Sequence, residues 1–147
     1  MPRDLIRSRS EALLKRFQLW EAHNKQVGQY SKGMKQKLTL VRAMLHDPQV
    51  LFLDEPTAGV DIELRRSMWA FLREINRQGI TIILTTHYLE EAESLCDRLA
   101  IMVAGRILAI GSPAEVKSRA AERLGSPVGT LEEAFIALIE TGEDSGK

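Results

Sequence analysis

The chain contains little cysteine and no long apolar run. The only cysteine, Cys96, excludes an internal disulfide framework and fits a reducing compartment. No apolar run approaches the roughly 18 residues that cross a bilayer. The first residues, Met-Pro-Arg-Asp, do not form an apolar signal segment. We therefore expect a cytoplasmic protein that meets a membrane only through a partner.

Net charge is also missing. Twenty basic and twenty acidic residues cancel, so no overall field attracts nucleic acid or an anionic membrane. A hydrophobic content of 44% and a charged content of 27% are ordinary for a globular protein. A chain of 147 residues is long enough to form a domain with a sizeable core. The composition predicts a globular protein without a nucleic-acid partner.

The most informative segment is Val50–Pro56, an apolar run that ends in two carboxylates. Four consecutive apolar residues predict a short strand buried on both faces. Asp54 and Glu55 follow, and Pro56 ends the strand. Unpaired carboxylates beside a core are costly, so they occur mainly where a metal or a reacting group offsets the cost. The pattern favours a nucleotide hydrolase over a solvated acidic turn.

A second apolar strand is predicted over residues 81–86, after a helix over 62–77. Strand, helix and strand with short links form a βαβ unit, so the two strands should be parallel. Their carboxyl ends then lie at one edge of the sheet, where open α/β sheets bind ligands. We therefore expect Asp54, Glu55 and His87 to lie together at this edge.

The remaining elements are mostly helical. Helical spacing predicts a helix over 10–23 that starts at a Ser10 cap, and a second helix over 33–46. Beyond the second strand, the sequence predicts a short helix, a hairpin, two further helices and a frayed tail. Their ranges are 88–96, 98–103 with 106–110, 113–124, 131–140 and 143–147. The turn of the hairpin is expected at Ala104-Gly105, and Thr130 and Glu133 have the spacing of a capping box.

Four segments, in the same order and spacing, closely resemble the C-terminal half of an ABC transporter ATPase domain. Tyr30–Gln36 (YSKGMKQ) resembles the signature motif, LFLDEP the Walker B strand, Ala58–Asp61 the D-loop, and His87 the switch histidine. The match covers about residues 10–112, and agreement at four motifs in register is not a chance event. The segments TTHYLEEAE and GTLEEAFIALIE look most like ATPases of drug and small-molecule export systems.

The resemblance implies an α/β fold. The expected structure is a truncated P-loop NTPase domain. It would contain parallel core strands, part of the helical signature subdomain, a C-terminal hairpin and C-terminal helices. We expect a signature-bearing helical part over 1–48. The core with Walker B, D-loop and switch should span 49–112, and C-terminal helices should span 113–147.

The resemblance also gives the residues at the sheet edge their roles. Asp54 would hold Mg²⁺, which prefers a few carboxylates together with substrate phosphates. Glu55 would polarise the attacking water. His87 would contact the γ-phosphate, although an ordinary strand-terminal histidine is the alternative.

Residues of the signature motif and the D-loop would act on a second subunit. Ser31, Lys32, Gly33 and Met34 would bind the ATP that the second subunit holds, and Asp61 would reach across to that subunit. From the residues alone, Ser31 is better explained as a helix cap, and Asp61 reads equally well as one. Lys32 stands where the family usually has glycine, so it adds a cation near the phosphate or clashes with it.

The sequence lacks the loop G-x-x-x-x-G-K-S/T, whose amides and lysine hold the β- and γ-phosphates in this family. Gly28 and Gly33 have the right separation, but Met34-Lys35 follows them instead of Lys-Ser or Lys-Thr. The resemblance therefore implies a truncated domain without its Walker A half. We expect the chain alone to bind ATP weakly and not to hydrolyse it.

The implied function is that of a C-terminal fragment of the ATP-binding subunit of an ABC transporter. Its intact form would use ATP and Mg²⁺ to drive export. The partners would be a second ABC ATPase subunit and a transmembrane permease subunit at the inner face of the cell membrane. One alternative is a non-catalytic remnant that acts as an interaction module. A DNA-repair ABC ATPase head is disfavoured because the sequence has no coiled-coil heptads and no basic patch.

Overall fold

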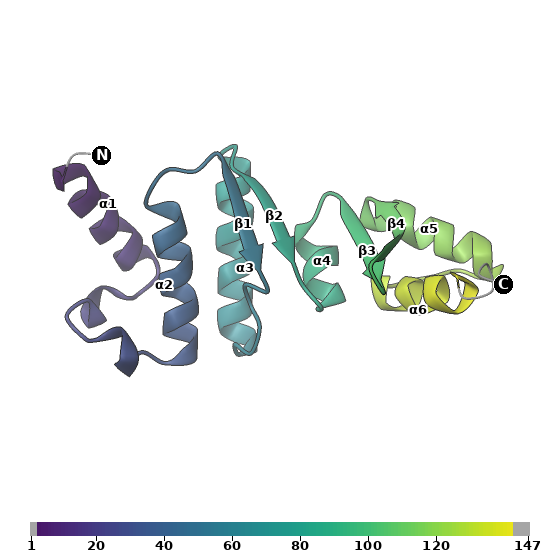
Figure 1. The fold of residues 1–147 in the computed structure, drawn as a ribbon, viewed down its shortest axis with the longest axis horizontal. Coiled ribbons are helices and arrows are strands. Elements are labelled where there is room, and N and C mark those ends of the chain that lie inside the picture. The colour runs from purple at the N-terminus through teal and green to yellow at the C-terminus, as the bar shows by residue number, and fades with distance from the viewer. Residues whose placement is uncertain (1–2, 143–147) are drawn as a thin grey trace. The chain divides into compact units, whose positions relative to one another are not determined.

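The computed structural model describes residues 3–142, which form two compact units (Figure 1). The first unit runs to Thr85 and the second begins at Thr86. This division coincides with neither of the boundaries expected near residues 48 and 112, which stay predictions. None of the helices within residues 3–142 is long and apolar enough to cross a membrane.

The first unit begins with α1 (Arg3–Arg16), followed by 3₁₀ turns at Trp20–Ala22 and Val27–Gln29. The expected helix over 10–23 is wrong at both ends. Ser10 lies inside α1, where its hydroxyl donates to the Ile6 carbonyl oxygen at 2.7 Å and caps nothing. Beyond the end of α1, Gln18 adopts a φ of 57°, a left-handed conformation that an α-helix cannot continue.

The expected βαβ unit is confirmed. Strands β1 (Val50–Asp54) and β2 (Thr81–Thr85) pair in parallel, and α3 (Ile62–Arg77) connects them. Residue 50 lies opposite residue 81, and Asp54 lies opposite Thr85. The remaining helix of this unit, α2 (Lys32–Met44), agrees with the sequence to within two residues at each end.

The sheet of the first unit is covered on one face only. Leu51 and Leu53 of β1 are buried, whereas Val50 is half-exposed and Phe52 is 73% exposed. The burial expected on both faces of this strand is therefore wrong for the described residues. A parallel sheet is buried on both faces only when helices cover both of them, and the described part of this unit places α3 on one.

Helix α3 also fixes the end of α1. The buried rings of Phe17 and Phe71 meet edge to face with centroids 4.4 Å apart. The Arg16 guanidinium lies over the Phe71 ring at 5.0 Å and forms an ion pair with Glu74. The turn after α1 is thus held by packing on α3.

The second unit contains α4 (Leu89–Leu95), β3 (Leu99–Val103), β4 (Arg106–Gly111), α5 (Pro113–Leu124) and α6 (Leu131–Gly142). Strands β3 and β4 form the expected antiparallel hairpin. Its turn residues, Ala104 and Gly105, have φ values of 48° and 75°, as a type I′ turn requires. The Thr130 hydroxyl accepts from the Glu133 N–H at 3.2 Å, and the Glu133 carboxylate accepts from the Thr130 N–H at 3.3 Å. This is the expected capping box.

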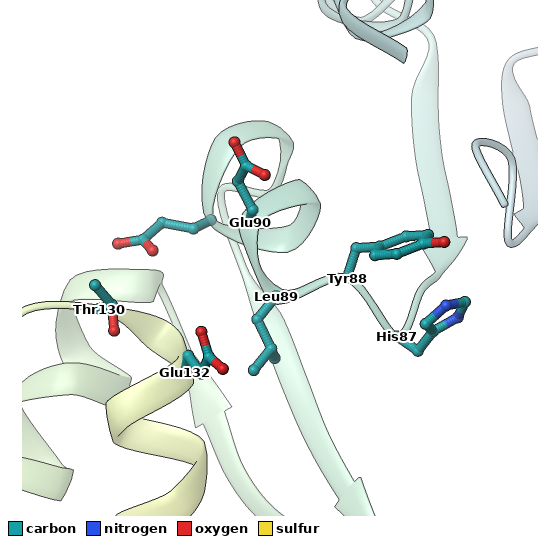
Figure 2. Close-up of a pocket in the computed structure, with 7 residues that line it drawn as sticks. His87, Tyr88, Leu89, Glu90, Thr130 and Glu132 are labelled. Atoms are coloured by element: carbon teal, nitrogen blue, oxygen red, sulfur yellow. The ribbon is translucent and has the colours of Figure 1, made fainter. Parts of the chain in front are cut away.

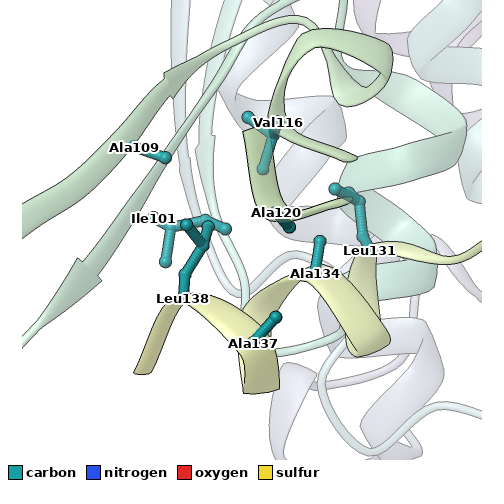
Figure 3. Close-up of a cluster of buried hydrophobic side chains, with 8 residues drawn as sticks. All are labelled: Ile101, Ala109, Val116, Ala120, Leu131, Ala134, Ala137 and Leu138. Carbon is teal, nitrogen blue, oxygen red and sulfur yellow. The ribbon is translucent and has the colours of Figure 1, made fainter. Parts of the chain in front are cut away.

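A compact apolar cluster lies between the hairpin, α5 and α6 (Figure 3). Many of its members are alanines, which allow the two helices to pack closely. The cluster consists of Ile101, Ala109, Val116, Ala120, Leu131, Ala134, Ala137 and Leu138. The hairpin is also covered on one face only, because Met102 and Ile107 are 63% and 55% exposed.

Candidate functional site

Asp54 lies exposed at the carboxyl end of β1, directly opposite Thr85. The Thr85 hydroxyl donates a hydrogen bond to the Asp54 carboxylate. This contact holds the carboxylate at the sheet edge. Thr85 was not among the residues predicted from the sequence, although the register of two parallel strands of equal length places their last residues side by side.

Glu55 is the first residue of a tight turn after β1. Its N–H donates to the Thr85 carbonyl oxygen at 3.0 Å, and its own carbonyl oxygen accepts from the Ala58 N–H at 3.1 Å. Its φ of 45° lies in the left-handed region, which costs a non-glycine residue about 1 kcal/mol or more. Pro56 and Thr57, the next two residues, are buried and anchor the turn. Glu55 itself is exposed beside Asp54 in the chain.

Ser31 caps α2, as one of the two readings of the sequence expects. Its hydroxyl oxygen accepts from the Met34 N–H at 3.2 Å. Asp61 caps α3 in the same way, and its carboxylate accepts from the Leu64 N–H at 2.8 Å. Both caps are confirmed, whereas contacts of Ser31 and Asp61 with ATP or a second subunit stay predictions.

The starts of α2 and α3 are packed against each other at Gly33. A Cβ atom on Gly33 would lie 2.5 Å from Cδ2 of Leu64, so a larger residue requires Leu64 to move. Leu64 is the residue whose N–H the Asp61 cap satisfies. The structure therefore brings Ser31 to Met34 and the D-loop segment into one neighbourhood of the first unit.

Lys32 lies over the D-loop segment. A Cβ atom on Gly59 would overlap the Lys32 ammonium and would lie 2.9 Å from Lys32 Cε. Gly59 has a φ of 66°, which glycine adopts without strain. The two effects on a phosphate that the sequence left open for Lys32 stay predictions. In this structure, the Lys32 side chain lies against the loop at Gly59.

His87 belongs to the second unit. Its ring lies beside that of Tyr88, with centroids 4.1 Å apart, and both residues line a pocket of about 450 Å³ (Figure 2). Glu90, Glu93 and Glu132 also line this pocket. The expected proximity of His87 to Asp54 and Glu55 involves both units and stays a prediction.

The chemistry at the end of β1 suits a magnesium ion that phosphate oxygens help to hold. Within residues 3–142, no group of three or more His, Cys, Asp or Glu side chains could hold a metal by itself. Mg²⁺ in phosphate sites needs only one or two carboxylates, because water and the substrate supply the other oxygens. The exposed carboxylate of Asp54, with the Thr85 hydroxyl beside it, fits this requirement.

Comparison with known proteins reveals the family. The ABC transporter family profile matches residues 5–58. The Nod factor export ATP-binding protein I of Burkholderia lata is 44% identical over 82% of this chain. The daunorubicin resistance ATP-binding protein DrrA3 of Streptomyces coeruleorubidus is 45% identical over 76%. The chain belongs to the ABC transporter ATP-binding proteins.

Solved structures show the same fold. The ATP-binding subunit of an ABC transporter superimposes with a TM-score of 0.79 and 29% identity over 95% of this chain. An ATP-binding cassette in its ADP conformation gives a TM-score of 0.66 with 26% identity over 75%. The expected α/β P-loop NTPase fold of an ABC ATPase is therefore confirmed.

This ABC chain spans only part of the proteins that it resembles. It covers 41% of the Burkholderia protein and 35% of DrrA3. In the solved ATP-binding subunit, it covers 56% of the chain. The similarity therefore identifies the family of this chain. It does not by itself assign the activity of a whole relative to this chain.

Proposed function

We propose that this chain is the C-terminal part of the ATP-binding subunit of an ABC exporter, whose whole form hydrolyses ATP to drive small-molecule export. The observation that carries the proposal is the exposed Asp54-Glu55 pair at the carboxyl end of a parallel strand, with Asp54 bonded to Thr85. The names of the two curated relatives, for Nod factor export and daunorubicin resistance, support export.

In this proposal, the acidic pair and His87 act on one ATP molecule. Asp54 holds Mg²⁺ directly or through water, and its hydrogen bond from Thr85 fixes the orientation of the carboxylate. Glu55 orients the attacking water, and the left-handed turn holds its backbone in place. His87 contacts the γ-phosphate.

The start of α2 serves the ATP of a second subunit. Helix N-termini favour anions because their first N–H groups are free of helix partners. Ser31 accepts from the Met34 N–H through its oxygen, so its hydroxyl hydrogen remains available for a phosphate oxygen. Gly33 adds a backbone N–H group, and Asp61 contacts the second subunit. A transmembrane permease at the inner face of the membrane is the other partner.

A chimera tests this function. The part of the Burkholderia protein that precedes its match to this chain is fused to residues 1–147, and Mg²⁺-dependent ATP hydrolysis is measured. We expect hydrolysis by the chimera and none by the chain alone. Glu55→Gln should lower kcat by about 10²- to 10⁴-fold. Glu63→Gln, which changes an exposed acid in the first turn of α3, is the control and should have little effect.

Two results would contradict the proposal. One is a chimera that hydrolyses ATP equally well with Gln at position 55. The other is a folded chimera without activity under conditions in which the Burkholderia protein is active. Binding of the chain to an ABC membrane subunit without hydrolysis by the chimera would instead indicate a non-catalytic interaction module.

A further inference from the structure

Lys32 is placed unfavourably for an ordinary surface lysine. It is the first residue of α2, where the helix dipole repels a positive charge, and no acidic residue occupies the first turn to compensate it. Lys32 is exposed, but its side chain crosses the backbone at Gly59, with Cε 2.9 Å from the position of a Cβ atom. The absence of a side chain at Gly59 makes room for this contact.

We propose that Lys32 is a positioning residue that holds the D-loop segment, Ala58–Asp61, against the start of α2. The inference rests on the proposed function, because it concerns the loop that would face a second subunit. Lys32 acts through the length of its side chain across Gly59 and not through a charge contact with ATP.

Three contacts in the first unit make this role physically coherent. Gly33, next to Lys32, is packed against Leu64, and Leu64 is tied to Asp61 by the helix cap. Lys32 adds a contact at Gly59, two residues before Asp61. The D-loop segment is therefore contacted at two points, at Asp61 through the helix cap and at Gly59 by the Lys32 side chain.

Amide hydrogen exchange of the full chain tests the contact without ATP. The N–H groups of Ala58 and Val60 donate within the turn, to Glu55 and Thr57, and report its opening. We expect Lys32→Gly to speed their exchange roughly tenfold, whereas Lys32→Met, which keeps most of the side chain, changes it little. Lys35→Met, an exposed lysine one turn further along α2, is the control. Equal exchange in all four proteins would overturn the inference.

A double-mutant cycle tests the specific pair. Gly59→Ala places a Cβ where the Lys32 ammonium lies, so it should displace the end of the Lys32 side chain and speed exchange in the turn when Lys32 is present. In the Lys32→Gly background, the same change should have a smaller effect, because only the strain of the positive φ remains. Additive effects of the two substitutions on exchange would show that Lys32 does not hold Gly59.

Kinetics of the chimera separate positioning from phosphate binding. Lys32→Met should leave the KM for ATP within about twofold of the unmodified chimera, and Lys32→Gly should lower kcat. A similar rise in KM for both variants would overturn the inference, because it would show a charge contact with the nucleotide. If the chimera is inactive, the proposed function fails, and hydrogen exchange still decides the role of Lys32.

Discussion

The Thr85 hydroxyl donates to the Asp54 carboxylate across the last paired residues of β1 and β2. The bond joins two residues that lie 31 positions apart in the chain. It forms because the parallel strands end in register. The side chain that would hold Mg²⁺ is thus oriented by a neighbouring strand and not by its own turn.

Loss of this bond should weaken both fold and activity. Thr85→Val keeps the β-branched shape but removes the donor, so the free energy of unfolding should fall by about 0.5–1.5 kcal/mol. Urea unfolding of the full chain measures this change. In the chimera, Thr85→Val should also raise the Mg²⁺ concentration needed for half-maximal hydrolysis. Thr85→Ser, which keeps the hydroxyl, is the control. An unchanged Mg²⁺ requirement in the valine variant would contradict the orienting role.

The bare face of the first sheet should make the isolated chain self-associate. Phe52 is 73% exposed, and Val50 and Ile83, on the same face, are 45% and 48% exposed. Exposed apolar strand faces promote association, and threonine retains β-propensity while removing most of the apolar area. Phe52→Thr should therefore shift the concentration at which the chain associates to higher values. Sedimentation velocity over a concentration series measures the shift.

The matched control for Phe52 is Val27→Thr. Val27 is 53% exposed, but it lies in a 3₁₀ turn and not on the sheet. The control should leave association unchanged. If both substitutions, or neither, change the association, the sheet face is not the surface responsible.

An ion pair should make the stability of the second unit depend on pH. The Lys117 ammonium lies 2.6 Å from the Glu93 carboxylate and lowers the pKa of Glu93 below its ordinary value, with help from the Leu131 N–H. A lowered pKa in the folded state means that the stabilisation is complete above the unfolded pKa. It is lost as the pH falls through the folded value.

Lys117→Met tests this pH dependence. Because the pair is partly exposed, we expect the substitution to cost about 0.5–1 kcal/mol at pH 7 and much less near pH 3. Unfolding curves followed by circular dichroism at both pH values measure the difference. Arg123→Met, in the last turn of α5, is the control. A loss of the same size at both pH values would show that Lys117 contributes packing and not charge.

Local patterns predicted several elements well. The caps at Ser31 and Asp61, the capping box of α6 and the turn at Ala104-Gly105 depend on side chains within a few residues of one another, so the sequence contains the whole interaction. The predicted helix start at Ser10 was wrong because a residue with the chemistry of a cap need not act as one. Ser10 has the chemistry of a cap, but its hydroxyl is satisfied by the preceding helical turn.

The sequence by itself determined the family, the βαβ order and the acidic end of β1, because motif spacing and apolar periodicity are local properties of the chain. Only the tertiary structure decided that Thr85 binds Asp54, that Leu64 fills the space at Gly33 and that Lys32 crosses Gly59. Each of these contacts joins two segments that are far apart in the sequence. Whether two such segments meet depends on strand register and helix packing. The tertiary structure also decided which face of β1 is covered, because the apolar residues of a strand do not specify on which face a helix packs.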